Sequence, residues 1–370
     1  MNDLYIGLMS GTSLDGVDAV LVDFAGDELK VIAHAHCPFE SALASELLAL
    51  NTPGSNELHR AALAANALVR VCATAIGALL SDSGVAAAQV RAIGAHGQTV
   101  RHRPGEFDGT GYTVQLNNPA LLAELSGIDV VADLRSRDVA AGGQGAPLVP
   151  AFHRAVFARA GENVAVMNIG GIANLSVLCA DGRTIGFDCG PGNMLMDHWC
   201  QQHTGRAYDA AGAWGASGRV DTPLLAKMLA NPYFALSAPK STGRDLFGAA
   251  WLTAQLQSCP TSLRAEDVQA TLAELTATAC ANDVLRHVPD ARELLVCGGG
   301  ALNDHLMRRL AAHLPAIRVR RTDERGLPAM QVEACAFAWL ARAFCERQPG
   351  NLSTVTGAAG PRLLGALYPA

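Results

Sequence analysis

Short apolar segments that end in glycine clusters recur along the chain and carry most of its predicted structure. These segments cover residues 4–9, 17–24, 164–169, 172–178 and 293–297. Gly11 and Gly16 separate the first two segments, and Gly170 and Gly171 separate the next two. Apolar runs of this length bounded by glycine are typical of buried strands. The pattern therefore predicts two hairpins, each formed by a strand, a glycine turn and a second strand.

The fifth apolar segment precedes a different kind of turn. Gly298, Gly299 and Gly300 follow it, and the next apolar residues repeat at helical spacing: Leu306, Met307, Leu310 and Leu314. A second helical pattern lies near the end of the chain and consists of Val332, Cys335, Ala336, Trp339, Leu340 and Ala343. We therefore predict a strand-to-helix turn at 298–300 and a final amphipathic helix.

The segments after the two hairpins follow one order, which predicts two copies of a single α/β plan. The first half shows strands at 30–36, 90–95 and 128–131 and a helix at 61–80. The second half shows strands at 183–188, 294–297 and 317–320, with helices between 193 and 286. A boundary near Pro147 to Pro150 gives the expected domains 1–147 and 148–370.

The composition narrows the class of protein. A chain of 370 residues, 50% of them hydrophobic, is long enough for two domains. Its longest strongly apolar stretch, 71–80, is shorter than the roughly 20 residues that span a bilayer. The net charge of −6 and only three lysines argue against nucleic acid as a partner. Ten cysteines without a C-x-x-C pair indicate a reducing cytoplasm, so we expect a cytoplasmic protein away from membranes.

Two glycine turns offer a way to bind phosphate with few lysines. Successive backbone amides in a glycine turn form a concavity that accepts phosphate oxygens, and Thr12 and Ser13 add hydroxyl donors to the first turn. The P-loop motif G-x-x-x-x-G-K-[ST] does not occur in the sequence. Two such turns facing each other across a domain cleft would hold a triphosphate from both sides. A single glycine cluster is more often a structural turn, and the recurrence favours the binding role.

The glycine turns lie within longer strings that resemble the anhydro-N-acetylmuramic acid kinase family. The matching strings run along the whole chain and cover residues 9–18, 95–102, 133–150, 168–175, 186–193 and 297–303. The family belongs to the sugar kinase/Hsp70/actin superfamily. The resemblance therefore implies two duplicated actin/hexokinase-like (RNase H-like) α/β domains with an inter-domain cleft. It also implies a small-molecule sugar substrate. The oligomeric state stays open, with a homodimer as one option.

The resemblance implies an ATP-dependent enzyme of cell-wall recycling that uses Mg²⁺. Water would open the 1,6-anhydro bridge of 1,6-anhydro-N-acetylmuramic acid, and O6 would take the γ-phosphoryl group to give N-acetylmuramic acid 6-phosphate. The expected ATP contacts are Gly11, Thr12, Ser13, Leu14, Asp15, Gly16, Val17, Asp18, Gly170, Gly171, Gly298, Gly299 and Gly300. The superfamily usually has Asp where this chain has Met9 and Asn168. The metal ligands therefore stay unassigned, although Asp15 or Asp18 could orient metal-bound waters.

Asp188 is the expected catalytic base. It stands at the end of a predicted strand and before a Gly-Pro-Gly turn, where open α/β sheets place their ligand crevice. A partly desolvated carboxylate has its basicity raised toward the working pH. From spacing alone, a turn or N-cap Asp before the helix near Asn193 is an equally good interpretation. The resemblance favours the catalytic role.

The sugar carries a lactyl carboxylate and an N-acetyl group, so its pocket should contain an arginine and polar partners. Arg135 is the candidate for the carboxylate. The other expected substrate contacts lie in the matching strings or on the last helix, and exposed loop or solvated residues are their alternative: Gln98, Thr99, Asp133, Asp138 and Glu333.

Two other functions remain open. The first is a non-catalytic nucleotide-binding protein of the same superfamily, which would use the glycine turns without a sugar pocket. The second is an ATP-independent glycoside hydrolase with two carboxylates, such as Asp188 and Glu333.

Overall fold

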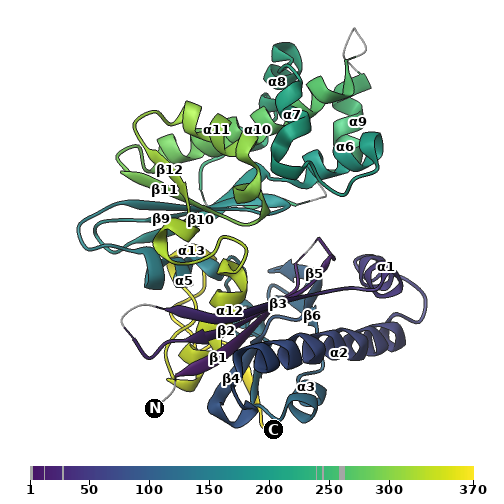
Figure 1. The fold of residues 1–370 in the computed structure, drawn as a ribbon, viewed down its shortest axis with the longest axis vertical. Coiled ribbons are helices and arrows are strands. Elements are labelled where there is room, and N and C mark those ends of the chain that lie inside the picture. The colour runs from purple at the N-terminus through teal and green to yellow at the C-terminus, as the bar shows by residue number, and fades with distance from the viewer. Residues whose placement is uncertain (1–2, 12, 27–28, 239, 244–245, 258–262) are drawn as a thin grey trace. The chain divides into compact units, whose positions relative to one another are not determined.

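The computed structural model describes residues 3–11, 13–26, 29–238, 240–243, 246–257 and 263–370. The chain divides into two compact units (Figure 1). Unit 1 combines Met1–Val156 with Gln331–Ala370, and unit 2 is Phe157–Met330. This division differs from the predicted domains 1–147 and 148–370, because residues 148–156 and 331–370 belong to unit 1.

Unit 1 is built on a six-stranded sheet with the order β13-β7-β4-β1-β2-β3. Its strands are β1 (Leu4–Met9), β2 (Gly16–Asp23), β3 (Lys30–Pro38), β4 (Val90–Ala95), β7 (Val130–Ala132) and β13 (Ala366–Tyr368). β1 pairs antiparallel with β2, and β2 pairs antiparallel with β3. β1, β4 and β7 run parallel to one another. The first predicted glycine hairpin is confirmed.

Unit 2 contains a five-stranded sheet with the order β10-β9-β8-β11-β12. Its strands are β8 (Val164–Ile169), β9 (Ile172–Leu178), β10 (Thr184–Pro191), β11 (Glu293–Cys297) and β12 (Arg318–Arg321). β9 pairs antiparallel with both β8 and β10. β11 pairs parallel with both β8 and β12. The order and directions are those of β3-β2-β1-β4-β7 in unit 1. The predicted duplication of one α/β plan is therefore confirmed.

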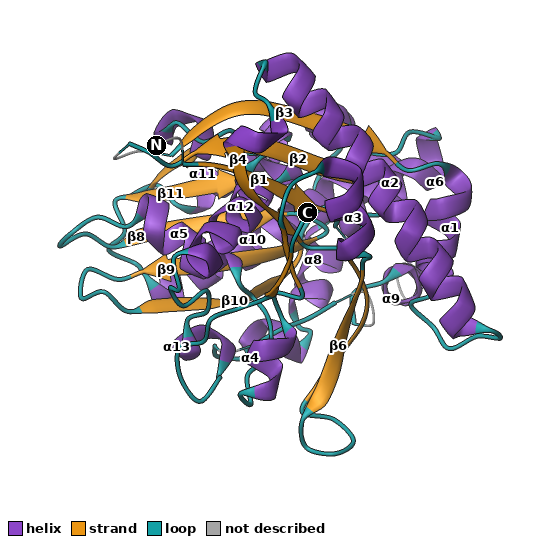
Figure 2. Cartoon of the chain, turned by 90° about the horizontal axis from the view of Figure 1, so that it is seen from below, coloured by secondary structure: helices purple, strands orange, loops and turns teal. Residues whose placement is uncertain are grey.

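Helices pack around both sheets (Figure 2). Those of unit 1 are α1 (Ser41–Ala49), α2 (Glu57–Ser83), α3 (Pro119–Ser126), α4 (Ser136–Ala140), α5 (Val149–Phe157, which ends at the boundary), α12 (Val332–Cys345) and α13 (Ser353–Thr356), with the 3₁₀ turn η1 (Ala87–Gln89). Those of unit 2 are α6 (Met194–Thr204), α7 (Ala213–Ser217), α8 (Thr222–Leu229), α9 (Ala249–Gln257), α10 (Ala265–His287) and α11 (Asp304–His313). Its 3₁₀ turns are η2 (Ala210–Gly212), η3 (Pro232–Ala235), η4 (Gly299–Leu302) and η5 (Thr322–Arg325). β11 therefore leads through η4 into α11, as predicted.

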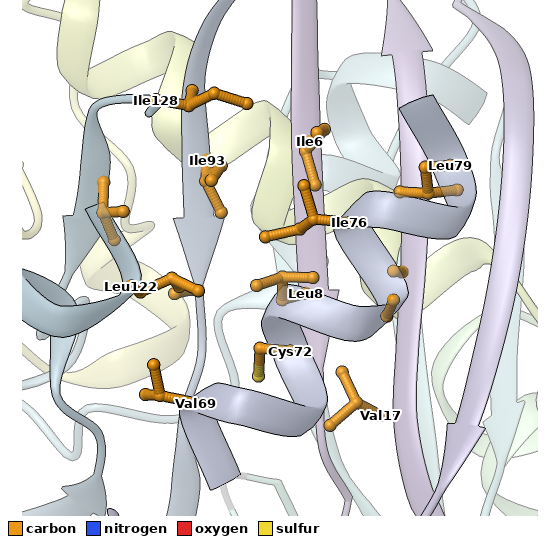
Figure 3. Close-up of a cluster of buried hydrophobic side chains, with 14 of the residues drawn as sticks. Ile6, Leu8, Val17, Val69, Cys72, Ile76, Leu79, Ile93, Leu122 and Ile128 are labelled. Carbon is orange, nitrogen blue, oxygen red and sulfur yellow. The ribbon is translucent and has the colours of Figure 1, made fainter. Parts of the chain in front are cut away.

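The core of unit 1 lies between α2 and the sheet. Cys72 and Ile76 of α2 face Leu8 and Ile6 of β1, and all four side chains are buried (Figure 3). By length and composition alone, α2 could cross a membrane. Its apolar face is used in this core, as expected for a buried helix of a globular domain.

The last helix, α12, packs on the face of the same sheet at very short distance. A Cβ on Gly7 of β1 would lie 1.9 Å from the carbonyl oxygen of Ala334, and a Cβ on Gly94 of β4 would lie 1.9 Å from that of Phe337. The predicted stripe of α12 is buried except for the half-buried Trp339, and most of the other faces of the helix are buried as well. The helix is therefore a core element of unit 1 and not an amphipathic surface helix.

A separate two-stranded sheet escaped prediction. β5 (Gln98–Pro104) and β6 (Gly111–Leu116) form an antiparallel hairpin that is not part of the six-stranded sheet of unit 1 (Figure 2). Residues 112–116 alternate apolar and polar, as in a strand, whereas residues 98–104 do not, so the sequence carried a strand signal for β6 alone. β5 begins at Gln98, which places this candidate residue next to the end of β4.

Candidate functional site

In unit 1, the candidate residues gather at one edge of the sheet. Because β1, β4 and β7 are parallel, their carboxyl ends lie at the same edge. Gly11 follows β1, Gln98 follows β4, and Asp133 and Arg135 follow β7. This is the edge at which open α/β sheets bind their ligands.

Side chains from the end of β4 hold the first glycine turn in place. The buried Ser10 hydroxyl donates to the side-chain oxygen of Gln98, Oε1, and Gln98 Nε2 donates to the Gly11 backbone carbonyl at 3.2 Å. Gln98 is 1% exposed. The expected contact between Gln98 and a sugar therefore does not fit the structure, because both ends of its amide are used inside the chain. Gln98 is a support for the turn.

The rest of the first turn is partly described. Ser13 donates through its hydroxyl to Asp15 at 2.8 Å, and Leu14 has a positive φ of 59°. Thr12 lies outside the described residues. The Asp18 carboxylate lies 3.0 Å from a ring nitrogen of His36 and 3.4 Å from one of His34. Across the described part of the chain, no group of three or more His, Cys, Asp or Glu side chains could hold a metal ion.

Arg135 is tied to the first glycine turn through His96. Arg135 donates from Nε and from an Nη atom to His96 Nε2, at 3.2 and 3.0 Å, and from its other Nη atom to the Gly145 carbonyl at 2.8 Å. Because arginine only donates, His96 accepts at Nε2 and carries its proton on Nδ1, 3.3 Å from the Ser10 carbonyl. Burial and the Arg135 charge lower the pKa of His96 to about 3, so the ring is neutral. The three bonds leave two N–H groups of the guanidinium for a ligand.

The charge of Glu333 acts on Arg135 within unit 1. Burial lowers the pKa of Arg135 to about 10, and Glu333 on α12 and Asp138 oppose that shift. Arg135 is thus a cation at neutral pH. The structure brings together two candidates that are far apart in the sequence.

Asp138 does not have the role expected from the sequence. Its side chain is 0% exposed, and its oxygens accept from the Gly145 amide at 2.8 Å, Asn351 Nδ2 at 2.6 Å and the Thr356 hydroxyl at 2.8 Å. Both carboxylate oxygens are thus used inside unit 1, which argues against a contact between Asp138 and a sugar. Asp138 joins the segment after β7 to the C-terminal segment of unit 1.

Asp133 and Thr99 lie closer to solvent than Asp138. Asp133 is exposed and has a φ of 56°, which is uncommon for a residue other than glycine. Such backbone conformations concentrate at functional sites. Thr99 is half-buried, and its hydroxyl accepts from Gln115 Nε2 at 3.1 Å.

In unit 2, a second set of candidates shares a sheet edge. β8 and β10 both pair antiparallel with β9, so they run in the same direction, which is also that of β11. Gly170 and Gly171 follow β8, Asp188 lies three residues before the end of β10, and Gly298 follows β11. The carboxyl ends of three strands thus gather Asp188 and two glycine turns.

The glycines of the turns fall into two groups. Gly16, Gly298 and Gly300 are required by close packing, since an added Cβ would lie 2.3 to 2.4 Å from Cys37, Asn168 or Ile169 atoms. An added Cβ on Gly11, Gly170 or Gly171 would meet no atom of the chain closer than 3.6 Å. Their φ angles are also outside the left-handed region. The fold itself does not require glycine at these three positions, whereas a ligand approaching the backbone would.

Gly299 and Asn168 complete the unit 2 turns. A Cβ on Gly299 would lie 3.3 Å from Asn193 Nδ2, a tight contact. The Oδ1 atom of Asn168 is buried and has no hydrogen-bond partner among the described residues. A buried carbonyl oxygen of this kind normally has a partner, so it is available to a ligand or to water.

Asp188 lies in a partly buried setting inside β10. Its Oδ2 accepts from the Thr242 amide at 3.1 Å, its own amide donates to the Lys240 carbonyl at 3.1 Å, and Tyr233 donates through its hydroxyl to the Asp188 carbonyl at 2.7 Å. Burial raises the pKa of Asp188 to about 6, against the Thr242 amide and the Lys240 charge. A carboxyl with this pKa can act as a general base near neutral pH.

The structure excludes the N-cap interpretation of Asp188. The cap of α6 is Asn193, and it makes no side-chain capping bond. Asp188 instead pairs with Asn174 of β9, and the strand register shifts directly after it. No sequence pattern pointed to its partners Lys240 and Thr242; the only available signal was that Lys240 is one of three lysines.

Known proteins that resemble this one match it along its whole length. The family model described as anhydro-N-acetylmuramic acid kinase matches residues 3–370. The anhydro-N-acetylmuramic acid kinase of Variovorax paradoxus is 64% identical over 373 residues, covering 100% of this chain and 99% of that protein. The protein of the same name from Albidiferax ferrireducens is 60% identical over 390 residues and covers both chains fully.

The solved structures that match this chain are distant from it in sequence. The activator of 2-hydroxyisocaproyl-CoA dehydratase from Clostridium difficile, with bound ADPNP, is 12% identical with a TM-score of 0.47, covering 94% of this chain and 96% of that one. A glucokinase of the ROK family from Streptomyces griseus, in complex with glucose and AMPPNP, is 14% identical with a TM-score of 0.41, covering 92% and 99%. Because the family model matches residues 3–370 and these two relatives are 64% and 60% identical, the chain belongs to the anhydro-N-acetylmuramic acid kinase family.

Proposed function

We propose that this protein phosphorylates 1,6-anhydro-N-acetylmuramic acid at O6 with ATP while water opens the anhydro bridge. The products are ADP and N-acetylmuramic acid 6-phosphate, an intermediate suited to peptidoglycan recycling in the cytoplasm. The observation that carries the proposal is the half-buried Asp188 with a pKa of about 6 at the strand edge of unit 2. Membership of the family supports the choice of substrate.

The reaction balances with one base. Asp188 takes a proton from water as the water oxygen bonds to C1 and the C1–O6 bond breaks. O6 bonds to the γ-phosphorus as the bond to ADP breaks, so the leaving oxygen of the sugar needs no proton. Phosphoryl transfer of this kind depends mainly on positioning and on neutralised charge.

ATP binding is assigned to the glycine turns. Gly11, Gly170 and Gly171 are the positions where the chain leaves room for a ligand against the backbone. Gly16, Gly298 and Gly300 shape the turns by packing. Mg²⁺, when bound, would neutralise phosphate charge, and the buried side-chain oxygen of Asn168, Oδ1, would suit one of its bound waters.

The sugar contacts that we retain are Arg135, Asp133, Thr99 and Glu333. Arg135 offers two N–H groups to the lactyl carboxylate, and Asp133 is exposed for hydroxyl or amide groups. Gln98 and Asp138 leave this set because their side chains are used within unit 1.

Arg135→Met is expected to raise the KM for the natural sugar because a charge-assisted pair with the lactyl carboxylate is lost. The expected loss in kcat/KM is about 2 kcal/mol, or roughly 30-fold. Steady-state kinetics with 1,6-anhydro-N-acetylmuramic acid and with 1,6-anhydro-N-acetylglucosamine, which lacks the lactyl ether, measure it. Arg137→Met is the matched control, since Arg137 is exposed on α4. An equal loss on both sugars would show that Arg135 only supports His96.

The pH dependence follows from the pKa of Asp188. The base must be deprotonated, so kcat/KM for the sugar is half of its plateau at about pH 6, rises toward the plateau above that pH and falls below it. At one unit below this pKa, about a tenth of the plateau remains. A pH–rate profile of wild-type enzyme tests this expectation. An acidic limb near 4, the ordinary range of aspartate, would contradict it.

The direct test of the function is ADP release by purified protein supplied with ATP, Mg²⁺ and the anhydro sugar. We expect sugar-dependent ADP formation and a phosphorylated sugar in equal amounts. ADP at background level would contradict the proposal and would support a non-catalytic nucleotide-binding role instead.

A further inference from the structure

We propose that Lys240 is a positioning residue for Asp188: its buried ammonium anchors the segment 240–242, whose backbone orients the Asp188 carboxylate. The inference rests on the proposed function, because it assigns a support to the proposed base. Lys240 touches none of the reacting atoms in this account and acts through the backbone of its own segment.

The ammonium of Lys240 is held in a closed site of unit 2. Its Nζ atom lies 2.9 Å from Asp283 Oδ2 and 3.2 Å from Asp283 Oδ1 on α10. The two side chains are 2% and 3% exposed. The Nζ atom also lies 5.1 Å from the ring centre of Tyr233 and 5.7 Å from that of Phe187. A cation buried this deeply keeps one geometry, since leaving it would strand both charges.

The backbone of the same segment holds Asp188 from two directions. The Lys240 carbonyl accepts from the Asp188 amide at 3.1 Å, and the Thr242 amide donates to Asp188 Oδ2 at 3.1 Å. The first bond fixes the main chain, and the second fixes the carboxylate. Because Lys240 and Thr242 are two residues apart, the anchor at Nζ limits how far the Thr242 amide can move.

Tyr233 links the anchor and the base. Its ring faces Nζ, and its hydroxyl donates to the Asp188 carbonyl at 2.7 Å. Phe187, the other ring beside Nζ, directly precedes Asp188 in β10. The site of the ammonium is therefore built from residues that hold the main chain of Asp188.

Within the described part of unit 2, charged and titratable groups from several elements surround this arrangement. Lys240 is the cation that acts on Asp188, and Tyr233 is the phenol beside it. Around the ammonium lie Asp283, Arg286 and His287 of α10, with the thiols Cys189 of β10 and Cys280 of α10 near Asp283 and Lys240. Arg286 approaches Asp283 Oδ1 at 3.5 Å, so it cannot replace Lys240 at Oδ2 without moving.

Lys240→Met keeps the length of the side chain and removes the charge. We expect kcat to fall about 100-fold with the KM for ATP unchanged within a few fold, because a misplaced base loses rate and not nucleotide affinity. The acidic limb of kcat/KM should move to higher pH, since the Thr242 amide and the Lys240 charge both favour the ionised carboxylate. Lys240→Arg should restore most of kcat and most of the original position of the acidic limb, because it keeps a buried cation opposite Asp283.

A second variant keeps the inference testable if Lys240→Met alone does not fold. Lys240→Met combined with Asp283→Leu removes the charge pair as a whole, so no unpaired charge remains buried. This double variant should keep its melting temperature within a few degrees but still show the loss in kcat and the displaced limb. Wild-type kcat and an unmoved limb in the folded double variant would overturn the positioning role.

Hydrogen exchange separates this inference from the function itself. The amide of Thr242 should be protected in the free wild-type protein and in Lys240→Arg, and exposed in the Lys240→Met variants. Unchanged protection would overturn the inference whatever the activity. The two proposals can also fail separately. If the Thr242 amide loses protection in the Lys240→Met variants as expected, but Asp188→Asn still turns over, Asp188 is not the base and Lys240 still anchors the segment.

Discussion

Asp188→Asn is expected to lower kcat by about 10³-fold, because asparagine keeps the shape of the side chain and cannot take a proton from water. It keeps the acceptor for the Thr242 amide, so the segment 240–242 should remain in place. ATP affinity should stay within a few fold, since the expected phosphate contacts are the glycine turns. Sugar-dependent ADP release and nucleotide titration of the same sample measure the two quantities.

A second carboxyl provides the matched control for this substitution. Asp197 of α6 also has a raised pKa, about 7, because of burial and the nearby Asp209. It lies outside the glycine turns and the strand edge that carry the proposed site. Asp197→Asn should leave kcat within a few fold. Wild-type turnover in Asp188→Asn, or a large loss only in Asp197→Asn, would move the base away from Asp188.

Gly7→Ala is expected to destabilise unit 1 by about 3 kcal/mol or more, because the new methyl group meets backbone atoms that cannot rotate away. The Cβ would lie 1.9 Å from the Ala334 carbonyl oxygen and 2.6 Å from the Ala338 amide nitrogen. Helix α12 would have to move off the sheet. Chemical denaturation followed by circular dichroism measures the change.

Gly77→Ala is the control for the glycine substitution. Gly77 lies inside α2, and a Cβ there would meet nothing within 4 Å. Alanine in a helix interior should stabilise the protein by about 0.5–1 kcal/mol, opposite in sign to the effect at Gly7. Equal stability of Gly7→Ala and wild type would mean that α12 does not pack on β1 as described.

The strands and their duplication could be predicted from the sequence because buried strands are short apolar runs with glycine at their ends. The return of residues 331–370 to unit 1 could not. It depends on Gly7 and Gly94, which lie inside strands and let α12 approach the sheet. A glycine inside an apolar run carries no local sign of the helix that will pack on it. Of the β5–β6 hairpin, only β6 alternates apolar and polar residues, and β5 has no period that separates strand from loop.

The candidate site was predicted at the level of segments and less well at the level of single side chains. Asp133 and Arg135 lie one and three residues after β7, yet Asp138, a little further along, is fully buried. Gln98 is also buried, because Ser10 and Gly11 use both ends of its amide. Which polar residue faces a ligand depends on partners from distant segments, such as Asn351 for Asp138. Lys240 was not predicted as part of the site either, because its partners Asp188 and Asp283 lie far from it in the sequence.

The central claim is that ring opening and phosphorylation occur together on this protein, and their stoichiometry tests it most directly. Purified protein, Mg²⁺ and 1,6-anhydro-N-acetylmuramic acid are incubated with and without ATP, and ADP, free sugar and sugar phosphate are quantified. We predict one ADP for each anhydro ring opened, all of the opened sugar phosphorylated, and no opening without ATP. Release of free N-acetylmuramic acid in the absence of ATP would contradict the account and identify a hydrolase.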